Sequence, residues 1–262
     1  MPRGILRNKQ YESPEIYENI SSLLINQYVP YNGDVILNYD WLDLVVLVDR
    51  SGSTSDFDTT KVCDAINGFI KDQYDNNPKV TTTLAAFDNT LQMIYKNKEE
   101  FKELEKNMIF PNGSTSLLES IGVMMKYKGQ HLASLKDERP GQVVFVIMTD
   151  GEENTSKNGW GDSDGGFDRL SELIREQEQV YSWKVFYLAA NQNAREIGKR
   201  MGINEERSLD FDFSTEGVSE AFRCASQVVS RLTNSSLEER TNFEGFTQDE
   251  RDLSMGNTVS VN

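Results

Sequence analysis

The strongest constraint on the fold is a near-continuous apolar run, residues 42–48, that ends in Asp49. Such a run is typical of a parallel strand that is covered by helices on both faces. A second apolar run, residues 143–148, is followed by Thr149 and Asp150. Ligands of open α/β sheets bind beyond the carboxyl ends of the strands. If the two strands are neighbours, about 4.8 Å apart, both carboxylates lie at one crevice.

Strand-like and helix-like segments alternate along the middle of the chain. This alternation predicts an α/β fold: a doubly wound, mostly parallel central sheet with helices on both faces and one short antiparallel edge strand. The tight turn Asp88-Asn89-Thr90 leads into the antiparallel strand. The predicted strands are residues 42–49, 80–87, 91–95, 141–148, 183–188 and 207–211. The predicted helices are residues 56–74, 99–106, 117–125, 129–135, 167–180, 194–201 and 215–232.

The two ends of the chain are weakly patterned. Residues 1–40 are interpreted as an N-terminal arm with one short helix near 14–24, which docks on the domain or on a partner. Residues 234–262 are polar, with few apolar anchors, and predict a flexible C-terminal tail.

Composition excludes several classes of function. The net charge of −15 argues against nucleic acid as a partner, because phosphate binding needs a basic surface. No apolar run reaches the roughly 18 residues of a membrane span, and the N-terminus lacks the apolar core of a signal peptide. The expectation is a soluble, non-secreted, cytoplasmic protein.

Hydroxyl side chains accompany the two strand-end acids. Ser51 and Ser53 follow Asp49 at alternate positions, and Thr115 opens a helix after a glycine-containing loop. Two carboxylates and three hydroxyls form an oxygen-only set of ligands, which suits hard cations such as Mg²⁺ or Mn²⁺. Neutral hydroxyls leave such a cation with excess positive charge, and that charge attracts an external carboxylate.

These residues resemble the metal-ion-dependent adhesion site of von Willebrand factor A domains. The matching segments are Asp49-Arg50-Ser51-Gly52-Ser53, Thr115 within Gly113-Ser114-Thr115, and Asp150 within Thr149-Asp150-Gly151. The resemblance covers about Trp41–Leu232 and implies such a domain over residues 41–233. It is closer to small von Willebrand A proteins of phages and bacteria, which have similar Thr-Asp-Gly-Glu-Glu-Asn and Ala-Asn-Gln-X-Ala segments, the latter being residues 190–194 here.

The resemblance also implies a role. Asp49, Ser51, Ser53, Thr115 and Asp150 would bind Mg²⁺, with Mn²⁺ or Ca²⁺ as alternatives, and a protein partner would supply an Asp or Glu carboxylate. A structural or assembly role, as in a phage particle, is a second hypothesis. A metal-assisted phosphoryl-transfer enzyme is the third, but Ser51 stands where such enzymes usually have another acid.

Other residues leave alternatives open. The protein is expected not to be an enzyme, with His131 on the surface and with Cys63 and Cys224 as core residues. Arg50 is expected either to orient a partner's carboxylate or to form a surface ion pair. Glu152 and Glu153 either tune the field of the site or are solvated acids. The segment 162–165 has a faint calcium-loop pattern, but an acidic surface loop is the better interpretation.

Overall fold

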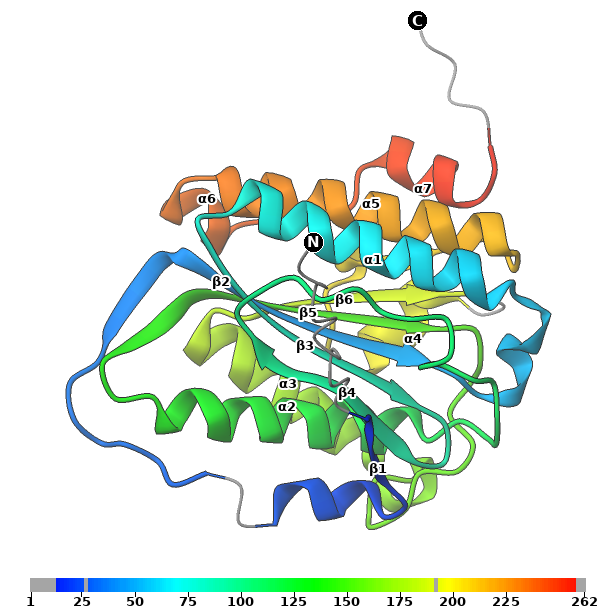
Figure 1. The fold of residues 1–262 in the computed structure, drawn as a ribbon, viewed down its shortest axis with the longest axis horizontal. Helices are drawn as coiled ribbons and strands as arrows, with labels where there is room; N and C mark the ends of the chain where they lie inside the picture. The colour runs from blue at the N-terminus through cyan, green and yellow to red at the C-terminus, as the bar shows by residue number, and fades with distance from the viewer. Residues whose placement is uncertain (1–12, 26–27, 191–192, 258–262) are drawn as a thin grey trace, which may run out of the picture.

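The protein is described by a computed structural model, in which residues 13–25, 28–190 and 193–257 are placed. One mixed sheet runs through the molecule, with strand order β1-β4-β3-β2-β5-β6-β7 (Figure 1). Its strands are β1 (Glu15–Tyr17), β2 (Ile36–Asp49), β3 (Lys79–Phe87), β4 (Leu91–Lys98), β5 (Glu138–Thr149), β6 (Lys184–Ala189) and β7 (Ser208–Asp210).

Five neighbouring strands, β3-β2-β5-β6-β7, are parallel. Strand β4 is antiparallel to β3, as the tight turn at Asp88 predicted, and β1 is antiparallel to β4. The predicted α/β fold class with a mostly parallel sheet is therefore confirmed. In place of the one short antiparallel edge strand that we expected, the sheet ends in an antiparallel pair, β4 and β1.

Helices cover both faces of the sheet (Figure 1). They are α1 (Thr59–Asn76), α2 (Leu117–Ser134), α3 (Gly166–Tyr181), α4 (Ala194–Arg200), α5 (Thr215–Asn234), α6 (Leu237–Thr241) and α7 (Gln248–Ser254). The short 3-10 turns are η1 (Ile20–Leu24), η2 (Gly52–Asp56), η3 (Asp162–Asp164) and η4 (Glu205–Arg207). None of the helices in the described ranges is both long and apolar enough to cross a membrane.

The alternation of side chains along β2 divides the core into two halves. Leu44 and Val46 pack with α1 and α5, whereas Val45 and Leu47 pack with α2 and α3. Successive strand residues point to opposite faces, so a strand that is buried on both sides must be apolar at almost every position. This is why the run at residues 42–48 was such a strong signal.

The predicted helix at residues 99–106 is wrong. The chain there has no helix, and two side chains from other elements bind its main chain. Asn67 bonds both the N–H and the carbonyl of Leu104, and the Tyr95 hydroxyl donates to the carbonyl of Glu103 at 2.6 Å. These bonds replace the helical ones, and Leu104 is buried in the core beside α1.

The two helices predicted at residues 117–125 and 129–135 form one continuous helix, α2. In the arm, the expected helix near residues 14–24 is instead strand β1 followed by η1. Ile20 and Leu23 of η1 are buried in the same half of the core as α2, so this described part of the arm docks on the domain. Residues 1–12 of the arm lie outside the described residues.

The C-terminal segment differs from the flexible tail that we expected. Residues 237–241 and 248–254 form α6 and α7, and between them Phe246 is buried and packs edge-on against Phe186, with ring centroids 5.7 Å apart. A single aromatic anchor of this size buries enough apolar surface to hold a short segment in place. Residues 258–262 lie outside the described part.

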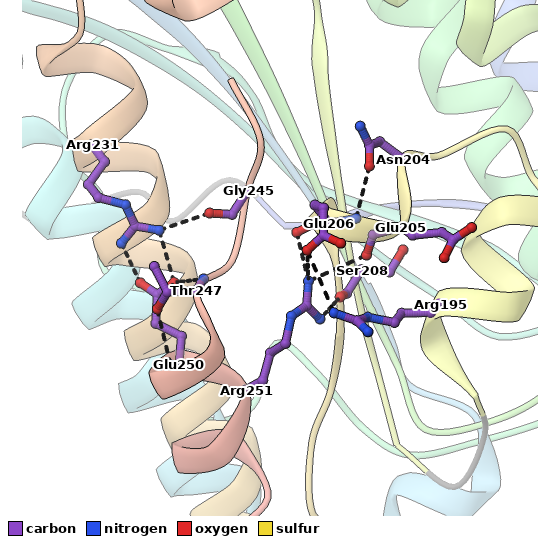
Figure 2. A network of polar contacts seen from close by, with 10 residues as sticks. All are labelled: Arg195, Asn204, Glu205, Glu206, Ser208, Arg231, Gly245, Thr247, Glu250 and Arg251. Carbon is purple, nitrogen blue, oxygen red and sulfur yellow. Dashed lines mark hydrogen bonds and ion pairs between the residues drawn. The ribbon is translucent and has the colours of Figure 1, made fainter. Parts of the chain in front are cut away.

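Two arginines tie α7 to the rest of the domain (Figure 2). Arg231 of α5 binds both carboxylate oxygens of Glu250 in α7, and it also donates to the carbonyl of Gly245. Arg251 of α7 donates to the carbonyls of Ser208 in β7 and Glu206 in η4. Fork-shaped guanidinium groups make such paired bonds well, and here they join α5, α7 and the last strand.

Candidate metal centre

The two strand-end acids lie at adjacent strands. Strands β2 and β5 pair in parallel register, with Val48 opposite Met148, so Asp49 ends β2 where Thr149 ends β5. The Thr149 hydroxyl donates a 2.5 Å hydrogen bond to Asp49 Oδ2. Asp150 follows directly. The two strands are therefore neighbours, which is the condition under which both carboxylates were expected at one crevice.

A chain of hydrogen bonds joins the first loop to Asp150. The main-chain N–H of Ser51 donates to Asp49 Oδ1 at 2.7 Å, which turns the loop back over the strand end. The hydroxyls of Ser51 and Ser53 lie 3.0 Å apart, and Ser53 Oγ donates to Asp150 Oδ1 at 3.0 Å. Four of the five predicted ligands are therefore in direct contact.

Gly151 shows that the fifth residue, Thr115, faces the same point. A β-carbon added to Gly151 would lie 3.2 Å from Thr115 Oγ1, 3.6 Å from Ser53 Oγ and 3.9 Å from Asp49 Oδ2. Oxygens from three separate loops thus surround one small space beside Gly151. A larger residue would crowd that space, which explains the glycine after Asp150.

The site is buried except at one side. Asp49, Ser51, Thr115 and Asp150 are each at most 3% exposed, whereas Ser53 is exposed. Burial raises the pKa of Asp49 to about 6, and hydrogen bonds from Thr149 and Ser51 oppose this rise. Burial also raises the pKa of Asp150. Burial is the largest cause of both shifts, because a carboxylate is costly to bury without a cation.

The donor set fits a hard cation. Asp150 Oδ2 is buried without a hydrogen-bond partner, and neither acid pairs with a lysine or arginine within the described ranges. The same part of the chain holds no cluster of three or more His, Cys, Asp or Glu side chains suited to a metal. An ion at this site would therefore rely on hydroxyl oxygens as well as on the two carboxylates, a combination that Mg²⁺ accepts.

The surface ion pair that was one of the two alternatives for Arg50 is wrong. Arg50 is 8% exposed, and its guanidinium forms an ion pair with Asp88 Oδ2 at 3.1 Å and donates a hydrogen bond to Thr90 Oγ1 at 2.7 Å. Asp88 is 1% exposed, so this is a buried ion pair rather than a surface one. The ion pair joins the first loop to the turn between β3 and β4. The carbonyl of Asp88 in that turn accepts the N–H of Ser116, at the start of α2.

The other neighbouring acids divide into two kinds. Glu152 is exposed, whereas the Glu153 carboxylate accepts the main-chain N–H groups of Leu118 and Ser156. In the segment 162–165, Asp162 is exposed and lies 3.4 Å from Arg200, as a surface loop would be.

His131 is not the surface residue that we expected. It is half-buried beneath the ring of Tyr28, with centroids 4.9 Å apart, and burial lowers its pKa to about 4. Cys63 and Cys224 are free and buried, as predicted for core residues. In the 190–194 segment, Asn191 and Gln192 lie outside the described residues.

Of the comparisons with known proteins, the one with solved structures bears on the fold. No family profile and no curated protein matches the chain. Among solved structures, the von Willebrand factor domain of the type V pilus tip protein Mfa5 from Porphyromonas gingivalis is similar at 9% identity, covering 74% of this chain and 97% of that one, with a TM-score of 0.53. The chain therefore has the fold of a von Willebrand factor type A domain.

Two further structures match with lower TM-scores. The von Willebrand factor type A protein from Catenulispora acidiphila is 11% identical, over 86% of this chain and 52% of that one, with a TM-score of 0.48. Proximal thread matrix protein 1 from the mussel byssus is 15% identical, over 72% and 46%, also with a TM-score of 0.48. The chain spans about half the length of each of these two proteins.

Proposed function

We propose that this protein is a divalent-cation-dependent protein-binding module. Asp49, Ser51, Ser53, Thr115 and Asp150 would hold Mg²⁺, or Mn²⁺ or Ca²⁺ in its place. The convergence of three loops on the space beside Gly151 is the observation that carries the proposal. Domains of this fold generally mediate protein–protein interaction.

The chemistry of the site favours an acidic ligand. A bound divalent ion would supply positive charge that two carboxylates and three neutral hydroxyls do not fully shield from an approaching carboxylate. Ser53 is the exposed member of the set, so it marks the side from which a partner's Asp or Glu would approach.

The charged residues around the site favour a partner with positive charge beside its carboxylate. Asp56, Asp58 and Glu152 are exposed around the first and third loops, and the negative charge of Asp56 contributes to the raised pKa of Asp150. In contrast, the nearby cations Arg50 and Lys61 are paired with Asp88 and Glu216. A partner carboxylate flanked by lysine or arginine would therefore bind better than one flanked by further acids.

We propose no catalytic role. His131 lies in the last turn of α2, whereas Thr115 precedes its first turn. The fourteen helical steps from Leu117 to His131 correspond to about 21 Å of helix, too far for the histidine to act as a base at the site.

Mn²⁺ relaxation of water protons tests the proposal directly. We expect the full chain to bind Mn²⁺ and Mg²⁺, and we expect Asp49→Ala to bind neither in calorimetry. Added acetate should displace metal-bound water and lower the relaxation enhancement, whereas acetamide should not. Unchanged Mg²⁺ affinity in Asp49→Ala would reject the site.

A structural role in an assembly, such as a phage particle, is the second candidate. A pull-down from the native source with Mg²⁺ and with chelator separates the two roles. Partners that are lost with chelator support binding through the metal, whereas partners kept with chelator indicate docking through another surface.

A further inference from the structure

The third loop is bound along the start of α2, beside Thr115. The carbonyl of Thr115 accepts the N–H groups of Asn154 at 3.1 Å and Thr155 at 3.2 Å. In return, the N–H of Thr115 donates to the side-chain oxygen of Asn154 at 3.0 Å. Asn154 thus holds both polar groups of the Thr115 main chain.

Glu153 completes this attachment. The N-cap residue of α2, Ser116, makes no side-chain capping bond. Instead, Glu153 accepts the N–H of Leu118 at 2.9 Å, and Ser156 Oγ accepts the N–H of Glu119 at 3.0 Å. The free N–H groups of a helix start need such partners, and a carboxylate there is favoured by the helix dipole. The loop that carries Asp150 therefore caps the helix that Thr115 opens.

We propose that Asn154 is a positioning residue of the metal site, an inference that rests on the proposed function. It holds the Thr115 main chain so that the threonine hydroxyl faces Ser53 and Asp49. It also fixes the distance between the second and third loops, since Asp150 lies four residues earlier. Under this proposal, the residues of the segment Thr149–Asn154 have separate roles: Asp150 binds the ion, Gly151 leaves room for it, Glu153 caps α2 and Asn154 holds Thr115 in place.

The exposure of Asn154 makes the idea testable. Because the residue is exposed, its replacement removes little packing, and the fold should tolerate the change. Asn154→Leu removes the acceptor for the Thr115 N–H, and Asn154→Asp keeps it. Asn112, which is exposed in the second loop and for which no side-chain bond is described, offers matched controls, Asn112→Leu and Asn112→Asp.

Calorimetric titration of the full chain with Mg²⁺, together with unfolding temperatures measured in EDTA, provides the test. We expect Asn154→Leu to weaken Mg²⁺ binding about tenfold, the scale of one hydrogen bond, and to unfold in EDTA close to wild type. Asn154→Asp should bind Mg²⁺ more tightly than Asn154→Leu. This gain in affinity should exceed the change that Asn112→Asp causes, because that control adds the same charge without the bond to Thr115.

Each other result has a distinct meaning. Wild type that binds no Mg²⁺ would reject the proposed function itself. Wild type that binds, with Asn154→Leu equal to Asn112→Leu, would overturn only the inference about Asn154. Asn154→Asp remaining as weak as Asn154→Leu would overturn it too, as would a large loss of stability in EDTA with unchanged Mg²⁺ affinity.

Discussion

Replacing Asp49 by asparagine should stabilise the metal-free protein while removing its response to Mg²⁺. Burial raises the pKa of Asp49 from 3.8 to about 6, so the folded protein holds this proton more tightly than the unfolded chain. The resulting stability is present below pH 3.8 and is lost as the pH rises to about 6. The shift corresponds to about 3 kcal/mol above pH 6.

The local hydrogen bonds can adapt to asparagine. The amide oxygen can still accept the N–H of Ser51, and the amide nitrogen can donate to Thr149 Oγ1. The Thr149 hydroxyl lies 3.1 Å from the carbonyl of Gly151, so it can donate there instead of to residue 49. The substitution therefore removes a buried charge without leaving a polar group unpaired.

Thermal unfolding at pH 7.5 in EDTA measures the effect. For a chain of this size, about 3 kcal/mol corresponds to a rise of roughly 6–12 °C in Tm. Mg²⁺ at one hundred times its Kd should stabilise wild type by about 2.7 kcal/mol and the variant not at all. Asp34→Asn, at an exposed aspartate, controls for the loss of one negative charge. A Tm for Asp49→Asn at or below that of wild type in EDTA would refute the reasoning.

Three further substitutions test other features. Burial lowers the pKa of His131 from 6.5 to about 4, so the free energy of unfolding of wild type should fall by up to about 3 kcal/mol as the pH falls from 6.5 to 4. Urea unfolding should show a smaller fall for His131→Gln. An equal dependence on pH in the two proteins would contradict this. Arg50→Met leaves the Asp88 carboxylate buried without its cation and should lower the free energy of unfolding by about 3–5 kcal/mol. The double variant Arg50→Met with Asp88→Asn should regain part of that stability. A loss below about 1 kcal/mol in Arg50→Met would count against a buried pair. Phe246→Ala should cost about 3–5 kcal/mol because the ring is buried against Phe186; an unchanged midpoint would instead support a flexible tail.

The sequence predicted those parts of the site that depend on local pattern. Asp49 and Asp150 were readable because each follows a run apolar on both faces, which can only be a central strand. Thr115 was readable because a glycine-containing loop precedes an amphipathic helix. In each case the information lies within about ten residues.

Partners between loops could not be read in this way. The ion pair of Arg50 with Asp88 and the bond of Thr115 to Asn154 join segments that are almost forty residues apart, so they depend on strand order and register. Thr149 was quoted only as part of a motif, although its hydroxyl binds Asp49. Its position directly before Asp150, at the end of β5, was the available signal.

The C-terminal helices were missed although a signal was present. Ser236 with Glu239, and Thr247 with Glu250, form capping boxes at the starts of α6 and α7. Serine or threonine followed three residues later by glutamate is a recognised helix start. These helices are too short to show apolar periodicity, which is why the pattern predicted a tail there. The opposite error occurred at residues 99–106, where a charged run predicted a helix and the structure has none.

Within the described residues, neither border of the sheet presents a long free strand. At one border, β1 covers the start of β4, and the remainder of β4 carries Lys96 and Lys98. At the other, β7 is only three residues long, and side chains of α7 occupy its carbonyls: Arg251 binds that of Ser208 and Ser254 binds that of Asp210. Open sheet borders invite pairing between molecules. Copies of this protein are therefore expected to have little tendency to pair edge to edge through the described strands.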